Sequence, residues 1–323
     1  MMTRRAHLAA VLGALLLTLP GAFAGNQKTP AGHQFGVIGH SFSKAGGEAR
    51  LKRALEATSD SELAFVVVTG IKGKDEPCSD KLYVRRQQLF DDAARPLIVA
   101  PAASDWSECK NSAGRLAAID RLNRLRELFF SEPAALGASR LALTRLSSSA
   151  KFRSYAENAH WEVGNVLYAT INLPANNNHY RPEAGRNSEY EDRLVANRFW
   201  LNRLFARARR EKAEAIVLFS EGDLKALAPE GGLRALLRGT ADKQDGFAPT
   251  RRQLLTLAQK FPGKVLLIDT AARADGAGPA IEWRANLGHL SLGSDALQVR
   301  VAPGTAKLFT LKDARDDEKG AQK

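Results

Sequence analysis

Short apolar runs alternate with segments of helical spacing along most of the chain. Six compact runs, rich in apolar and β-branched residues, indicate buried strands at 35–39, 65–68, 97–100, 166–171, 216–219 and 265–268. Apolar residues spaced three and four apart predict helices over 48–58, 83–93, 112–130, 188–213 and 251–260. A capping box of Ser188 and Glu191 is expected to open the fourth of these helices. This order predicts an α/β fold with parallel strands and right-handed crossovers.

The C-terminal part changes from apolar runs to alternation. Leu290 and the segments 297–301 and 307–311 alternate with period two, which predicts terminal antiparallel strands. Residues 313–323 are highly charged and lack apolar spacing, so we expect a disordered tail. Since no repeat or strong compositional break divides the chain, a single domain is expected over 25–312.

The first 24 residues have the pattern of a secretory signal peptide. Arg4 and Arg5 precede a short apolar run, and Ala22-Phe23-Ala24 is a small-residue cleavage pattern. An uncleaved N-terminal anchor is the alternative interpretation. Cleavage after Ala24 would leave 323 − 24 = 299 residues and lower the formal charge from +12 to +10, because two arginines are removed. We therefore expect a periplasmic or secreted protein.

The two cysteines each follow a predicted strand by about ten residues. Neighbouring parallel strands would bring Cys78 and Cys109 to the same edge of the sheet. An oxidising compartment favours their pairing, and a disulfide is therefore predicted, with two buried free thiols as the alternative.

Overall composition narrows the class of protein only broadly. The chain has 323 residues, of which 44% are hydrophobic and 25% charged, as is typical of globular proteins. These values exclude a disordered chain, a collagen and a disulfide-dense mini-protein. Ligand sites of open α/β sheets form beyond the carboxyl ends of the strands, so the residues there are the candidates for chemistry.

Several motifs in chain order resemble one known family. They are 35–40, Ile71-Lys72-Gly73, Glu76-Pro77-Cys78-Ser79-Asp80, Asp105-Trp106-Ser107-Glu108-Cys109, Glu157-Asn158-Ala159-His160-Trp161, Ala169-Thr170-Ile171-Asn172 and Asn177-Asn178. Together they resemble the calcineurin-like phosphoesterase (metallophosphoesterase) superfamily, and within it a secreted bacterial branch. The resemblance implies a layered sandwich of two mixed β-sheets flanked by helices.

The resemblance also implies a site for two divalent metal ions, and this sequence departs from its ligand pattern. His40 stands where the family has an aspartate, and Gly70 and Ile71 where it has Gly-Asp. Ala103 and Ser104 replace the third group of ligands, Asn172 replaces a histidine, and Asp269 lies where a histidine pair is expected. Alanine and glycine side chains cannot bind a metal. The sequence therefore predicts a degenerate site without a resident metal or other cofactor.

The preferred interpretation is a non-catalytic exported protein that uses the inherited cleft for binding or scaffolding. The alternatives are an active phosphoesterase with a site rebuilt from His40, Asn172 and Asp269, and a module whose arginine-rich helix faces bind an acidic partner. Arg203, Arg207 and Arg210 form one such face. The other arginine-rich face lies on the helix predicted over 112–130. Arginines that cover apolar neighbours and pair with acids are the simpler interpretation.

Further residues are candidates for ligand contact. Asp105, Trp106, Asn177 and Asn178 could bind a small or phosphorylated ligand, although asparagine runs also satisfy loop backbone. Glu221 and Asp223 could form an acid–base pair, but solvated loop carboxylates are expected. His179 and His289 have no partner at a recognisable ligand spacing. No nucleic-acid partner is expected, an anionic envelope component is an option, and the sequence leaves the oligomeric state open.

Overall fold

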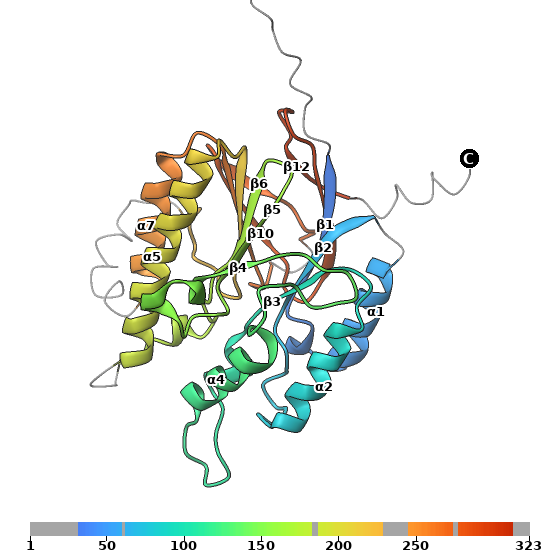
Figure 1. Cartoon of the computed structure of the whole chain (residues 1–323), viewed down its shortest axis with the longest axis vertical. Helices are drawn as coiled ribbons and strands as arrows, with labels where there is room; N and C mark the ends of the chain where they lie inside the picture. The colour runs from blue at the N-terminus through green and yellow to red at the C-terminus, as the bar shows by residue number, and fades with distance from the viewer. Residues whose placement is uncertain (1–31, 60–61, 183–186, 229–244, 274–276, 313–323) are drawn as a thin grey trace, which may run out of the picture.

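A computed structural model describes residues 32–59, 62–182, 187–228, 245–273 and 277–312. Two mixed β-sheets pack face to face, and helices cover the outer face of each (Figure 1). The expected α/β class and the two flanked sheets are therefore confirmed. The expectations for residues 1–24 and 313–323 lie outside the described residues.

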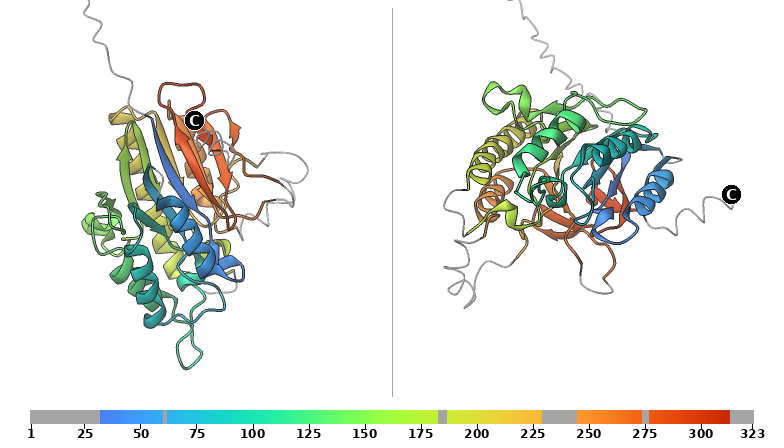
Figure 2. Two further views of the ribbon diagram at one scale, coloured as in Figure 1. Left: turned by 90° about the vertical axis from the view of Figure 1, so that its right-hand side faces the viewer. Right: turned by 90° about the horizontal axis from the view of Figure 1, so that it is seen from below.

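The first sheet has five strands in the order β12-β11-β1-β2-β3. They are β1 (His33–Ile38), β2 (Leu63–Thr69), β3 (Leu97–Ala100), β11 (Ala296–Val301) and β12 (Phe309–Leu311). The three N-terminal strands are parallel, whereas β11 runs antiparallel to β1 and to β12. Figure 2 shows these C-terminal strands beside β1. The predicted terminal antiparallel strands over 297–301 and 307–311 are thus confirmed.

The second sheet has seven strands in the order β4-β5-β6-β7-β8-β10-β9. They are β4 (Thr144–Arg145), β5 (Ala159–Val163), β6 (Val166–Thr170), β7 (Ala215–Phe219), β8 (Lys264–Asp269), β9 (Glu282–Arg284) and β10 (Leu287–Ser291). Four central strands, β6, β7, β8 and β10, are parallel. Leu290 lies in β10, which pairs in parallel with β8 and antiparallel with β9, so the antiparallel pairing expected there is found on one side of the strand only.

Six described α-helices accompany the sheets. Those of the N-terminal half are α1 (Gly47–Ser59), α2 (Asp80–Asp91), α3 (Ala103–Trp106) and α4 (Ala118–Phe129). Those covering the second sheet are α5 (Ser188–Arg210) and α7 (Ala248–Gln259). Short 3-10 turns occupy Ser41–Ser43, Leu146–Ser148, Ala150–Phe152 and Asn177–His179.

Two details of the predicted helices are wrong. The helix expected from residue 112 starts at Ala118, because residues 111–115 form a turn that Gly114 closes at φ +74°, and Leu116 is exposed. The capping box at Ser188 does not form. Asn187 precedes the helix instead, and its side chain bonds both main-chain polar groups of Arg181.

The fold has four layers, namely the two sheets and the helices on the outer face of each sheet. Three apolar clusters fill the spaces between these layers. The central cluster lies between the sheets and contains a set of packed aromatic rings, which are Phe35, Phe65, Trp161, Tyr168 and Phe219. The other two clusters fill the space under α5 and α7 and under α1, α2 and α4. Burial on this scale fixes both sheets relative to each other, and their carboxyl ends therefore meet in a defined geometry.

Cys78 and Cys109 are bonded in the structure, with their Cα atoms 5.8 Å apart. Cys78 lies just before α2 and Cys109 just after α3, so the disulfide joins the segments that follow β2 and β3. This is the pairing expected from the placement of the two cysteines.

We expect the double substitution Cys78→Ser/Cys109→Ser to lower the free energy of unfolding by about 3–4 kcal/mol, because the bond closes a loop of 31 residues. Urea unfolding measures the loss, and a reductant should destabilise only the unsubstituted protein. Two reactive thiols in unreduced, denatured protein would show that the bond does not form.

Candidate functional site

The carboxyl ends of strands from both sheets meet at His40, Ser104 and Glu221. His40 follows β1, Ser104 lies in α3 directly after β3, and Glu221 follows β7. His40 Nε2 lies 3.0 Å from Ser104 Oγ and 3.9 Å from Glu221 Oε1. All three groups are polar, and the side chains of His40 and Glu221 are buried.

Glu221 connects the two sheets at this end. Its Oε2 accepts hydrogen bonds from the main-chain N–H of Ala103, at 2.6 Å, and of Ala175, at 2.7 Å. Ala103 follows β3 of the first sheet, and Ala175 lies in the loop after β6 of the second. Only 5% of Glu221 is exposed, so the expectation of a solvated loop carboxylate is wrong for this residue.

Gly70, directly after β2, has no room for a side chain. Its φ of +84° favours glycine, and a Cβ atom there would lie 2.8 Å from His40 Nδ1. The His40 ring therefore occupies the space that a side chain at position 70 would need.

Asp105 and Lys72 close the neighbouring part of the cluster. The Asp105 carboxylate is fully buried and accepts main-chain N–H groups from Ile71, Lys72 and Ala102. Lys72 Nζ donates to the carbonyls of Gly73, at 2.6 Å, and Ser104, at 2.9 Å. Trp106 is also fully buried. The carboxylate and the ammonium group thus hold the loops together.

Burial dominates the ionisation of these groups. Desolvation, with a smaller effect of the Lys72 charge, lowers the pKa of His40 to about 4. Desolvation raises the pKa of Glu221 to about 8 against two main-chain hydrogen bonds, and it raises the pKa of Asp105 to about 6. At neutral pH His40 is therefore a neutral imidazole.

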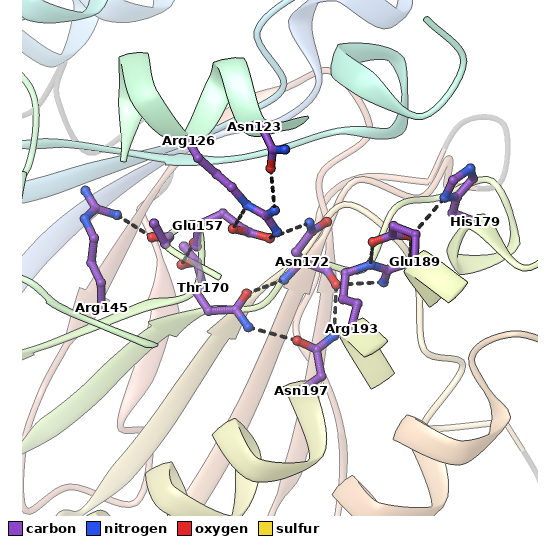
Figure 3. Close-up of polar contacts among 12 residues, drawn as sticks. Asn123, Arg126, Arg145, Glu157, Thr170, Asn172, His179, Glu189, Arg193 and Asn197 are labelled. Atoms are coloured by element: carbon purple, nitrogen blue, oxygen red, sulfur yellow. Dashed lines mark hydrogen bonds and ion pairs between the residues drawn. The ribbon is translucent and has the colours of Figure 1, made fainter. Parts of the chain in front are cut away.

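Asn172 belongs to a different network, which Figure 3 shows. Its Nδ2 donates to Glu157 Oε1 at 3.1 Å, and Glu157 forms a bidentate pair with Arg126 of α4. Asn172 Oδ1 has no hydrogen-bond partner among the described residues. This network connects the end of β6 to α4.

A second group of contacts holds the asparagine loop to α5, and Figure 3 shows three of its residues, His179, Glu189 and Arg193. Arg193, fully buried, bonds both the side chain and the carbonyl of Asn178 and pairs with Glu189 at 2.7 Å. Glu189 also contacts His179 Nδ1 at 2.9 Å. Asn177 Oδ1 accepts the main-chain N–H of Gly246. The view that His179 lacks a partner is therefore wrong.

Asp269, at the end of β8, contacts a second histidine that the sequence did not pair. His289 Nε2 lies 2.6 Å from Asp269 Oδ2 and 3.7 Å from Asp223 Oδ1. Burial lowers the pKa of His289, but the two carboxylates outweigh this effect and raise it above its ordinary value. The view that His289 lacks partners is wrong, because β10 returns in parallel beside β8.

The arginine faces are largely engaged with acids. Arg207 pairs with Glu162 and Glu211, and Arg121 and Arg124 both pair with Asp80. Arg203 donates to Ser149. These pairs match the simpler interpretation of the arginines.

An open groove of about 530 Å³ lies between the start of α4 and the start of α5. Its lining includes the exposed side chains of Leu116 and Ile119 and charges of both signs, Asp120 and Arg181. The mixed charges give the groove no preference for a phosphate group.

The residues present do not fit a two-metal site. Gly70 and Ala103 offer no side-chain ligand, Glu221 Oε2 already accepts two N–H groups, and His40 Nε2 contacts Ser104. His40, Asn172 and Asp269 are also bonded to three different groups of partners. The alternative of a site rebuilt from these three residues would therefore require each of them to give up its present contact.

Comparison with known proteins gives no assignment. No protein-family model matches the chain, and no curated protein matches it significantly. Within the described residues, no helix has the length and apolar character needed to cross a membrane.

The Glu189 network makes a prediction about pH. Burial alone would raise the pKa of Glu189, but Arg193 and His179 outweigh it and lower the pKa to about 2. A lowered carboxylate pKa stabilises the fold above the unfolded value, and this stabilisation is lost as the pH falls below about 4.5 toward 2.

We therefore expect the free energy of unfolding to fall between pH 7 and pH 3 by about 2 kcal/mol more in the unsubstituted protein than in Glu189→Gln. Urea unfolding at both pH values measures the difference. Glu191→Gln, which alters an exposed carboxylate of the same helical turn, is the matched control and should behave like the unsubstituted protein. Equal pH dependence in Glu189→Gln and the unsubstituted protein would contradict the account.

Proposed function

We propose that the chain is an exported, non-catalytic member of the calcineurin-like phosphoesterase superfamily that acts by binding or scaffolding. The ordered motifs of the sequence support the family, and the two flanked mixed sheets are the architecture that the resemblance implies. The disulfide between Cys78 and Cys109 supports export, because such bonds persist in oxidising compartments.

One observation carries the non-catalytic part of the proposal. In a two-metal phosphoesterase, paired ions at the strand ends would activate water and stabilise the transferred group. At the strand ends of this structure, Glu221 accepts hydrogen bonds from main-chain N–H groups that follow strands of both sheets. The His40 ring fills the space beside Gly70. A contact between the Glu221 carboxyl group and two main-chain amides supports the proposal, because it occupies the place that the resemblance gives to the ions.

The alternative is an active phosphoesterase, and it would require the contacts of His40 and Glu221 to break. His40 would have to leave Ser104, and Glu221 would have to release two buried N–H groups, each costing about 1–3 kcal/mol if left unsatisfied. The structure offers no replacement ligands at Gly70 and Ala103. This energetic argument favours a non-catalytic role.

The test is a hydrolysis assay on the mature chain, purified without chelators and supplied with Mn²⁺, Zn²⁺ or Mg²⁺. We expect p-nitrophenyl phosphate and bis(p-nitrophenyl) phosphate to be hydrolysed no faster by the unsubstituted protein than by His40→Ala. Metal-dependent hydrolysis that is lost in His40→Ala but kept in the control His179→Ala would refute the proposal.

A further inference from the structure

Three side chains from separate strands or loops converge near the group formed by His40, Ser104 and Glu221. Asp269 ends β8, His289 lies in β10, and Asp223 lies in the loop after β7. One ligand atom from each lies within 4.8 Å of the others. Parallel pairing of β8 with β10 produces this meeting, because Leu290 and Ser291 lie opposite Ile268 and Asp269.

More acceptor oxygens surround His289 Nε2 than it has protons to donate. Nε2 carries at most one proton, and Asp269 Oδ2, at 2.6 Å, is placed to accept it. Asp223 Oδ1, at 3.7 Å, accepts only the main-chain N–H of Lys225 among the described residues. Ser291 Oγ, 3.4 Å from Nε2, donates to Asp269 Oδ1, so its lone pairs are free.

The negative charge of this cluster is poorly compensated. Among the residues that the structure describes, neither Asp223 nor Asp269 pairs with a lysine or arginine. Glu282 adds a third carboxylate directly opposite His289 on the antiparallel strand β9. A divalent cation would neutralise the two aspartates, whereas a single proton on His289 neutralises only one charge.

We propose that Asp223, Asp269 and His289 form a binding site for one Zn²⁺ ion. Imidazole nitrogen with carboxylate oxygen is a donor set that zinc accepts, whereas Mg²⁺ and Ca²⁺ favour oxygen ligands alone. Zinc bonds of about 2.0–2.2 Å place tetrahedral ligand atoms about 3.3–3.6 Å apart, a spacing that the separations of 2.6 and 3.7 Å bracket. The proton between Nε2 and Asp269 would leave to solvent.

The burial of the three residues suits such a site. Asp269 is buried and held by Ser291 Oγ and the main-chain N–H of Ala271. The side chains of Asp223 and His289 are partly exposed, so an ion can reach them and a fourth ligand can come from solvent. The site shares only Asp269 with the positions that the family resemblance assigns, and it is independent of the proposed function.

The experiment is a Zn²⁺ titration of the mature chain after removal of bound metal, followed by calorimetry and by competition with a chromogenic Zn²⁺ indicator. We expect one ion per chain. His289→Ala should weaken binding by at least about 100-fold, because even second-shell substitutions cost roughly 10- to 100-fold. Asp223→Asn, at a partly exposed loop position, tests the site with little risk to folding and should weaken binding by at least about 10-fold.

The control variant is His179→Ala, which removes another histidine bound to a carboxylate and should leave Zn²⁺ affinity unchanged. Absence of stoichiometric binding would overturn the proposal, as would an unchanged affinity in both His289→Ala and Asp223→Asn. Loss of the ion in His40→Ala alone would place it at the family position instead. Failure of the non-catalytic proposal would appear separately, as phosphoester hydrolysis that depends on His40.

Discussion

The carboxyl group of Glu221 joins the two sheets at the end where their parallel strands converge. One oxygen accepts N–H groups from Ala103, after β3, and from Ala175, after β6. The apolar layer between the sheets holds the two sheet faces together. It does not determine how the loops that follow the strands contact one another. Glu221 supplies one such contact, and His40 and Ser104 lie beside it.

This contact is physically different from a metal bridge, although both can join two sheets. A metal ion needs several converging side-chain ligands and an accessible coordination position for its reactant. Glu221 needs only main-chain N–H groups, and main-chain groups place no demand on the side chains of Gly70 or Ala103. Residues without side-chain ligands at these two positions are therefore compatible with a well-packed end of the sandwich. The cluster of Asp223, Asp269 and His289 differs from the Glu221 contact, because it consists of converging side chains that have few hydrogen-bond partners.

Six strands are predictable because each is a compact buried run, and the sequence pattern reports burial well. The strands β4, β5 and β9 are not predicted, because β4 has two residues, β5 interrupts its apolar residues with His160 and Glu162, and β9 is exposed. The late start of α4 is not predicted either, since the exposed Leu116 fits helical spacing by coincidence. The candidate site was less predictable. Glu221 follows a strand and precedes Gly222, as a loop residue would, and only the packing of both sheets buries it. His289 lies 20 residues from Asp269, and their contact depends on the parallel return of β10.

We propose that Glu221 and its amide contacts take the place of the ions of a two-metal site. Anomalous X-ray scattering from crystals grown with Mn²⁺ or Zn²⁺ is the sharpest test, because it locates metal ions without reference to activity. We expect no anomalous peak between His40 and Glu221, with Glu221 still bonded to Ala103 and Ala175. Two peaks about 3.5–4 Å apart at that position, with Glu221 released from the amides, would contradict it.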